Sequence, residues 1–247
     1  MLVEADYAAM SRRAAAVIDA AVRADPTIVL ALPTGATPVG TYAALGDLHR
    51  RTGTDWSQVT TFNLDEYVGV APDHPASYAA YMQAHLFTVV NLAAARRHVP
   101  DGLAADPGGE AARYEAAIDA AGGIDLAVLG IGPNGHLGFN EPAERLTGAT
   151  HVAELSEETW RRNFPDLAAQ APAREARVGE RPFGRAYTMG IATILQARRI
   201  LLLASGVSKR GILRAALEGP VTPRNPASFL QLHGDVTLVL DREAAGE

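Results

Sequence analysis

The chain has 247 residues, 48% of them apolar and 20% charged, which is ordinary for a globular protein able to bury a substantial core. Its formal net charge is −6 and no basic run alternates with aromatics, so nucleic acid is not expected as a partner. The absence of cysteine excludes disulfides, thiol nucleophiles and cysteine-bound metals. No stretch approaches the ~20 apolar residues of a membrane span and the N-terminus lacks a signal-peptide core, so we expect a cytoplasmic protein without membrane contacts.

Helical and strand-like segments alternate along the chain. Alanines and larger apolar residues at helical spacing predict the helices, and short apolar runs predict buried strands. In chain order we expect a helix over residues 5–23, the strand "TIVLALP", a helix over 38–49, the strand "QVTTFNLDEY", helices over 77–87 and 110–121, the strands "IDLAVLGI" and "RRILLLAS", a helix over 209–218 and the strand "VTLVLD".

The predicted strands are apolar without alternating with polar residues, as in a sheet that is covered on both faces. With helices between the strands, this pattern predicts an α/β fold: a doubly wound, mostly parallel, Rossmann-like sheet with helices on both faces. Nothing divides the chain, so we expect a single domain over residues 1–247. Residues 156–185 are rich in arginine and proline with weak periodicity, and they are read either as a lid or as an irregular surface excursion.

Four of the predicted strands end in loops that carry chemically suggestive residues. Ligands of open α/β sheets bind beyond the carboxyl ends of the strands. We therefore expect these four loops to share one edge and to form one site. The loops are "LPTGATP", "NLDEY", "GPNGHLGFNEP" and "SGVSK".

Two of these loops have the features of an anion site. In "PTGATP" (33–38), a glycine and two threonines precede a helix, where free N–H groups suit a phosphate, although the spacing is neither that of a P-loop nor that of a dinucleotide fold. Lys209, the only lysine of the chain, begins another predicted helix. A bound anion would offset the unfavourable interaction of that cation with the helix dipole. Alternatively, residues 33–38 form an ordinary turn between a strand and a helix, and Lys209 is a solvated surface lysine.

The other two loops carry acid–base groups. Asp65 and Glu66 are adjacent carboxylates, and partial burial would raise the pKa of one of them toward neutrality. Alternatively, Asp65 caps a turn and Glu66 faces water. His136 supplies an imidazole, a group that is able to relay protons if another group fixes its tautomer. Glu141 is able to hold or polarise it, whereas Asn134 only donates or accepts hydrogen bonds. These residues lack the compact spacing of a zinc site, so no metal is expected.

Seven segments together resemble the glucosamine-6-phosphate deaminase family. They run in order from Leu32 to His233 and cover most of the chain. Related 6-phosphogluconolactonases share the fold, but "LDEY" and "FNEP" resemble the deaminase forms. The segments are "LPTGATPVGTY", "TFNLDEYVGV", "HPASYAAYM", "GIGPNGHLGFNEP", "TMGIATIL", "SGVSKR" and "PASFLQLH".

The resemblance implies deamination and isomerisation of glucosamine 6-phosphate to fructose 6-phosphate and ammonia, without a cofactor. It implies that Asp65 moves a proton between carbons 2 and 1 and that His136 opens the sugar ring. Asn134 and Glu141 would assist His136. The residues implied to bind the substrate and its phosphate are Thr34, Gly35, Ala36, Thr37, Gly135 and Lys209.

The chain departs from the family pattern at two places. Asn134 stands where some members carry an aspartate, so we expect it to orient rather than ionise. In "EETWRRNFPDL" the spacing of Arg161 and Arg162 does not match the lid arginine that contacts phosphate, which leaves open the sugar that is bound. The alternatives are a related substrate such as galactosamine 6-phosphate, a lactonase, or a non-catalytic sugar-phosphate sensor. The short tail favours a monomer or a small homo-oligomer.

Overall fold

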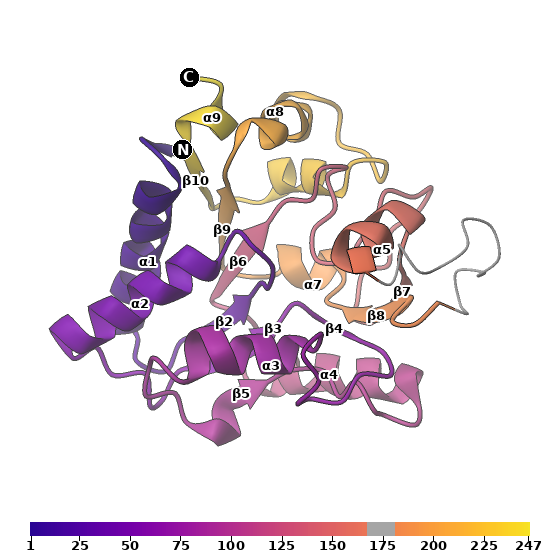
Figure 1. Cartoon of the computed structure of the whole chain (residues 1–247), viewed down its shortest axis with the longest axis horizontal. Helices are drawn as coiled ribbons and strands as arrows, with labels where there is room; N and C mark the ends of the chain where they lie inside the picture. The colour runs from indigo at the N-terminus through magenta and orange to yellow at the C-terminus, as the bar shows by residue number, and fades with distance from the viewer. Residues whose placement is uncertain (167–180) are drawn as a thin grey trace.

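A seven-stranded parallel sheet lies at the centre of the protein (Figure 1). The computed structural model describes residues 1–166 and 181–247. Every neighbouring pair of strands in this sheet is parallel. In spatial order the strands are β1 (Leu2–Glu4), β10 (Val236–Asp241), β9 (Arg199–Ala204), β6 (Leu126–Gly130), β2 (Val29–Leu32), β3 (Thr60–Asn63) and β5 (Arg97–His98).

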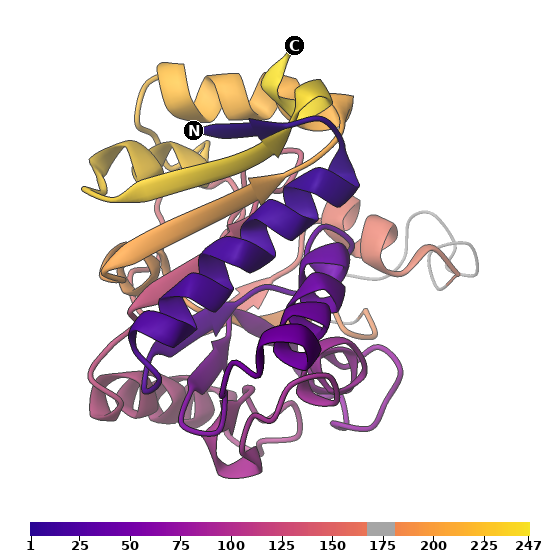
Figure 2. The ribbon, with the colours of Figure 1, turned by 90° about the vertical axis from the view of Figure 1, so that its left-hand side faces the viewer.

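Helices cover both faces of the sheet, as predicted (Figures 1 and 2). Along β6, Ala127 and Leu129 face one core cluster, whereas Leu126 and Val128 face the other, because successive side chains of a strand point to opposite faces. One cluster contains residues of α1 (Tyr7–Ala24), α2 (Val39–Thr52), α3 (Tyr78–Met82) and the π-helix η1 (Gln83–Phe87). The other contains residues of α4 (Pro107–Ala120), α7 (Ile191–Leu195), α8 (Arg210–Glu218), the 3-10 helix η5 (Pro226–Leu232) and α9 (Arg242–Ala245).

A second, three-stranded antiparallel sheet lies beside the carboxyl edge of the parallel sheet. Its order is β4 (Asp65–Tyr67), β8 (Arg185–Thr188) and β7 (His151–Glu154). A small aromatic cluster packs it against α5 (Glu157–Asn163). Two short 3-10 turns, η2 (Ala94–Arg96) and η4 (Val207–Lys209), complete the described elements. None of the helices in the described part of the chain is long and apolar enough to cross a membrane.

Three departures from the predicted elements bear on the site. The strand "QVTTFNLDEY" is broken at Leu64, after which the chain leaves the parallel sheet and enters the antiparallel one. The helix over residues 77–87 is an α-helix only to Met82 and then widens into η1. Lys209 does not begin an α-helix: it ends the 3-10 turn η4, and α8 starts at Arg210.

Candidate active site

The four loops predicted to share one edge do so. Strands β9, β6, β2 and β3 are consecutive neighbours in the parallel sheet, so their carboxyl ends lie side by side. The chain builds the sheet in one direction from β2 through β3 to β5, and then in the other direction from β6 through β9 to β10. The switch point therefore falls between β2 and β6, where doubly wound folds bind their ligands.

A cleft of 480 Å³ opens at this switch point. It brings together seven of the ten residues predicted for the site: Thr34, Gly35, Ala36, Thr37, Asp65, His136 and Lys209. Sequence reasoning missed Tyr78 and Asn163, which also line the cleft, and it left open Arg162, which lines it too. Asn134, Gly135 and Glu141 do not line the cleft.

The loop after β2 has the backbone of an anion site. Gly35 has φ = +97°, a conformation that residues with a side chain rarely adopt, and a Cβ placed there would meet no atom within 4 Å. Within the described part of the chain, no protein acceptor bonds the backbone N–H groups of Thr34, Gly35, Ala36 and Thr37. These donors precede α2, where an anion is favoured.

Two cations lie at the same cleft. The Lys209 ammonium donates a hydrogen bond to the Ile131 carbonyl at 2.7 Å, and burial together with the charge of Arg162 lowers its pKa. Arg162, near the end of α5, lines the cleft, whereas Arg161 turns outward to pair with Glu157. Geometry therefore distinguishes the two arginines and puts Arg162 at the cleft.

Asp65 is a buried carboxyl group at the start of β4. Its Oδ1 atom has no hydrogen-bond partner among the described residues. Burial and the neighbouring Glu66 raise the pKa of Asp65 to about 8, against an opposing hydrogen bond from Thr34. Gly138, with φ = +58°, brings the backbone close: a Cβ there would lie 3.6 Å from Asp65 Oδ2. A pKa of about 8 brings proton exchange at Asp65 close to neutral pH, where an unperturbed carboxyl group is fully ionised.

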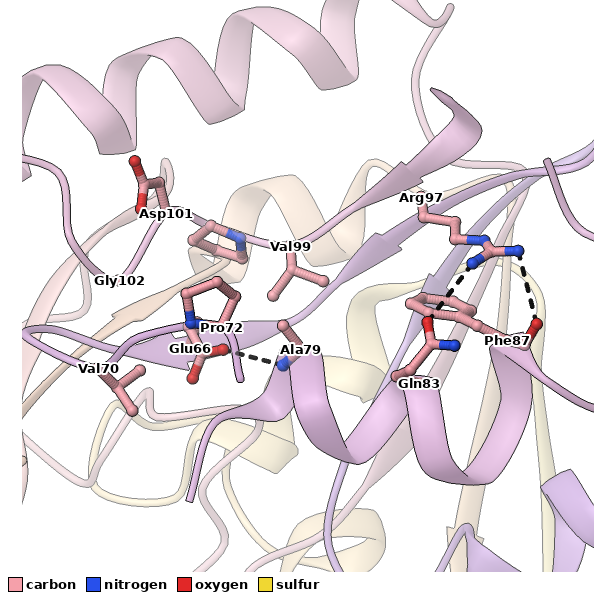
Figure 3. A pocket seen from close by; sticks show the side chains of 11 residues that line it. Glu66, Val70, Pro72, Ala79, Gln83, Phe87, Arg97, Val99, Asp101 and Gly102 are labelled. Atoms are coloured by element: carbon pink, nitrogen blue, oxygen red, sulfur yellow. Dashed lines mark hydrogen bonds between the residues drawn. The ribbon is translucent and has the colours of Figure 1, made fainter. Parts of the chain in front are cut away.

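Glu66 faces away from the cleft and holds the start of α3. It accepts hydrogen bonds from the backbone N–H groups of Tyr67, Tyr78 and Ala79 and from the Ser77 hydroxyl. Figure 3 shows the bond to Ala79 and side chains that line a second hollow on that side. This hollow has a volume of 390 Å³. The alternative in which Asp65 caps a turn while Glu66 faces water is wrong, because Glu66 is only 1% exposed and accepts hydrogen bonds from backbone N–H groups at the start of α3, beside the N-cap residue Ser77.

His136 lies directly over a glycine. A Cβ on Gly132 would lie 2.3 Å from His136 Nε2, so the absence of a side chain at residue 132 lets the imidazole ring lie flat against the backbone. The Gly132 N–H also donates to the His136 carbonyl at 2.9 Å, which closes the loop. His136 Nδ1 is 3.7 Å from Glu141 Oε2, a separation that suits an ion pair with the protonated ring.

Glu141 stands behind His136 and is held as a carboxylate. Burial alone would raise its pKa, but His136 and hydrogen bonds from Thr159 and Asn134 lower the pKa to about 2. Asn134 Nδ2 donates to Glu141 Oε2 at 2.7 Å, and its Oδ1 accepts from the backbone N–H of His136 at 3.2 Å. Asn134 therefore bridges the other two residues, and an amide is able to make both bonds at once.

Gly135 lies in the loop after β6, next to His136. The Gly135 N–H bonds the Gly132 carbonyl and its own carbonyl bonds Ala227, so both backbone groups are used within the protein. Contact of Gly135 with a substrate stays a prediction.

Of the expected lid over residues 156–185, residues 167–180 lie outside the described residues, so the lid also stays a prediction. Among the residues described, no three histidine, aspartate or glutamate side chains gather as a metal-binding group.

Comparison with known proteins identifies the family. The family model described as glucosamine-6-phosphate isomerases/6-phosphogluconolactonase matches residues 4–144. A protein of Halothermothrix orenii is 46% identical over 99% of this chain and 98% of its own length. A protein of Rhodopirellula baltica is 47% identical over 97% of this chain and 92% of its own length. This chain therefore belongs to the glucosamine-6-phosphate isomerase/6-phosphogluconolactonase family, which confirms the resemblance seen in its motifs.

The relatives that match over their full length point to one branch of the family. Both proteins just cited are named glucosamine-6-phosphate deaminase. A solved structure described as a monomeric glucosamine-6-phosphate deaminase has a TM-score of 0.89 and 42% identity, covering 100% of this chain and 99% of that chain. The 6-phosphogluconolactonase from Trypanosoma cruzi has a TM-score of 0.78 at 21% identity, covering 100% and 95%, which shows a shared fold.

Proposed function

We propose that this protein is an enzyme of amino-sugar catabolism that converts glucosamine 6-phosphate and water to fructose 6-phosphate and ammonia. The observation that carries the proposal is the meeting, in one cleft, of a buried carboxyl group, an imidazole and a loop with free N–H groups beside two cationic side chains. The first two supply acid–base chemistry, and the third recognises a phosphate. The near full-length relatives that are named for this activity support the same conclusion.

The reaction begins with opening of the sugar ring. A proton must leave the hydroxyl on carbon 1 while another is given to the ring oxygen, a task suited to an imidazole, which both donates and accepts protons. His136 would carry these protons. Glu141, kept ionised by its hydrogen bonds, would stabilise the ring of His136 when it is protonated, and Asn134 would fix the geometry of both.

The second step moves a proton between two carbons. Asp65 would take the proton from carbon 2 of the open-chain sugar; the electron pair forms the carbon 1–carbon 2 double bond of an enolamine as the aldehyde oxygen takes up a proton. Return of the proton to carbon 1 gives the imine at carbon 2, which water converts to the ketone and ammonia. The carboxylate must lie within about 3 Å of this weakly acidic hydrogen in an oriented site.

The phosphate supplies binding energy away from the reacting carbons. Free N–H groups of the loop after β2 would receive it, together with Lys209 and Arg162. Each contact with a charged group is stronger than a neutral hydrogen bond. Because the phosphate does not react, this binding energy is available to orient carbons 1 and 2 toward Asp65 and His136.

We infer that the enzyme acts as a monomer in the cytoplasm. The structure with a TM-score of 0.89 is described as a monomeric deaminase, and it covers this chain from end to end. Light scattering on the purified protein, with and without substrate, tests the first inference: a single species of about 26 kDa is expected.

An ammonia-release assay over a panel of 6-phosphorylated sugars tests the proposed function. Glucosamine 6-phosphate is expected to be turned over fastest. Faster release from galactosamine 6-phosphate would assign the other epimer, and hydrolysis of 6-phosphogluconolactone without ammonia release would assign a lactonase. Binding of the sugar phosphates without any turnover would assign a sensor.

Replacement of Asp65 by asparagine should abolish ammonia release. Loss of a general base costs about 10²–10⁴-fold in rate. Binding of fructose 6-phosphate, measured by calorimetry, should change little, because the phosphate site is untouched. Asp73→Asn, at an exposed aspartate of the following loop, is the matched control and should retain activity. Near-normal turnover by Asp65→Asn would contradict the role of Asp65 as the base.

A further inference from the structure

Three tyrosine hydroxyl groups form hydrogen bonds with backbone carbonyls of the loop after β2 (33–38). Tyr42 of α2 donates a hydrogen bond to the Pro33 carbonyl at 2.5 Å, and Tyr81 of α3 donates to the Gly35 carbonyl at 2.6 Å. Tyr7, the first residue of α1, lies 3.2 Å from the Ala36 carbonyl and 3.1 Å from the Thr37 carbonyl. Three helices thus send one hydroxyl group each to the same short loop, although the chain has only seven tyrosines.

Three of these bonds, those to the carbonyls of Pro33, Gly35 and Ala36, also determine where a backbone N–H group points; the Thr37 carbonyl precedes Pro38, which has no N–H. In a planar trans peptide, the C=O and the N–H of the next residue point in opposite directions. The carbonyls of Pro33, Gly35 and Ala36 share their peptide planes with the N–H groups of Thr34, Ala36 and Thr37. The described residues offer no acceptor to these three N–H groups. Because each carbonyl points toward a tyrosine hydroxyl, the N–H of the same peptide points away from that tyrosine.

The loop and the helix that follows it contain glycines, so the backbone here needs contacts that restrict its conformation. Gly35 has φ = +97°, and a glycine loses more conformational freedom on ordering than any other residue. Tyr7 also accepts a hydrogen bond from the Gly40 N–H at 2.9 Å, and a Cβ on Gly40 would lie 3.0 Å from the Tyr7 hydroxyl. Tyr7 therefore ties the loop to the first turn of α2 at a place where only a glycine fits.

We propose that Tyr7, Tyr42 and Tyr81 are positioning residues that hold the Pro33–Pro38 loop in its phosphate-binding conformation before the substrate arrives. This inference rests on the proposed function only in naming the phosphate as the group that is bound. A hydroxyl donated to a carbonyl also polarises the peptide and makes its N–H a better donor. The tyrosines thus act on the affinity for phosphate, and not on the reacting carbons.

Tyrosine-to-phenylalanine variants test the proposal, since they remove a hydroxyl group and keep the ring. Tyr7→Phe, Tyr42→Phe and Tyr81→Phe should each raise the Kd for inorganic phosphate and the KM for glucosamine 6-phosphate by about threefold to tenfold. The kcat should change less than twofold, because Asp65 and His136 are untouched. The double variant Tyr42→Phe/Tyr81→Phe should lose more phosphate affinity than either single variant.

Tyr114→Phe is the matched control. The hydroxyl of Tyr114 is buried and donates to the carbonyls of Asn63 and His98 at 2.9 and 3.0 Å, so its loss removes comparable hydrogen bonds from the protein but none from the loop. Its Tm should fall while its Kd for phosphate stays at the wild-type value. If the three loop variants change the phosphate Kd no more than Tyr114→Phe does, the proposal is overturned.

Calorimetric titration with inorganic phosphate separates this inference from the proposed function, because it needs no turnover. If the wild-type protein releases no ammonia but binds phosphate, and the loop variants weaken that binding, the proposed function fails and the role of the tyrosines stands. If the wild-type protein binds no phosphate, the inference itself is overturned. A fall in kcat with unchanged phosphate affinity overturns it as well.

Discussion

Asp65 and Glu66 are neighbours in sequence with opposite surroundings. Because successive side chains of a strand point to opposite faces, β4 directs Asp65 into the cleft and Glu66 toward the start of α3. Glu66 receives four hydrogen bonds there, whereas Asp65 Oδ1 receives none from the described residues. Glu66 therefore acts on the reaction only through its charge and through the helix it holds.

Removal of the charge of Glu66 should move the pH profile of the reaction. Asp65 must be ionised to act as a base, so kcat/KM should rise with pH through its raised pKa of about 8. In Glu66→Gln the neighbouring negative charge is gone, the pKa of Asp65 falls, and the rising limb should shift to lower pH. Steady-state kinetics across the neutral and alkaline range measures this limb.

Glu144→Gln provides the comparison, since Glu144 is an exposed carboxylate that pairs with Arg224. Its pH profile should coincide with that of the wild-type enzyme. A rising limb that stays in place in Glu66→Gln would show that Glu66 does not tune Asp65.

At the scale of residues, strand ends were the signal by which the sequence indicated residues that lie at the cleft. Asp65, His136 and Lys209 each follow an apolar run, and all three line the cleft. Arg162 was left unresolved because it reaches the cleft from α5, which is distant in sequence from the other loops. Tyr7, Tyr42 and Tyr81 carry no local signal either, since each lies in a helix whose spacing says nothing of a hydroxyl that bonds a loop.

The loop after β6 depends on glycines at which the backbone meets another group closely. At Gly132 that group is the imidazole of His136, and at Gly138 it is the Thr188 hydroxyl, 2.8 Å from a Cβ built there. The same Thr188 hydroxyl accepts a hydrogen bond from the Phe139 N–H at 3.0 Å, which holds the loop against β8. The loop is thus shaped by contacts that forbid side chains rather than by flexibility.

A methyl group at residue 132 should displace the imidazole. In Gly132→Ala the new Cβ would overlap the His136 ring, and a misplacement of about 1 Å is able to cost about 10²-fold in rate. The kcat for the cyclic substrate should fall by this order while the Kd for inorganic phosphate changes little. Gly234→Ala, where a Cβ meets nothing within 4 Å, should behave as the wild-type enzyme. Equal activity of the two variants would contradict the packing of His136 on Gly132.

At the scale of elements, the long apolar strands and the helices between them were predictable, and the antiparallel sheet was not. Residues 58–67 read as one strand because both halves are buried; the break at Leu64 arises because its N–H bonds Leu32 of one sheet and its carbonyl accepts from Met189 beside the other. Such a partition is decided by contacts distant in sequence. The edge strands β1 and β5 are short, which leaves no periodicity to detect.

At the scale of the whole molecule, folding shifts the pKa values of two carboxyl groups in opposite directions. The pKa of Asp65 is raised to about 8 by burial and by Glu66, and the pKa of Glu141 is lowered to about 2 by its donors despite burial. The folded state therefore binds a proton at Asp65 more tightly than the unfolded chain does, and at Glu141 less tightly. Stability is linked to pH with opposite sign at these two residues.

The free energy of unfolding should fall on the alkaline side because of Asp65. Its contribution is complete below the unfolded pKa of about 4 and is lost as the pH rises through about 8. Asp65→Asn removes this dependence and should be more stable than the wild-type protein above that range, by about 1–2 kcal/mol. Urea denaturation at a series of pH values measures the difference. Parallel curves for the two proteins would contradict the burial cost assigned to Asp65.

The one lysine of the chain makes its amine chemistry unusually simple. Lys209 is the only side-chain amine in 247 residues, it lines the cleft, and burial and Arg162 lower its pKa and so favour the uncharged, nucleophilic form. An acylating reagent therefore has a single side-chain target, and a phosphate bound beside it would shield that target. The extent of acylation of Lys209 would therefore measure the fraction of protein molecules without bound phosphate. The same reaction would block the cleft in those molecules.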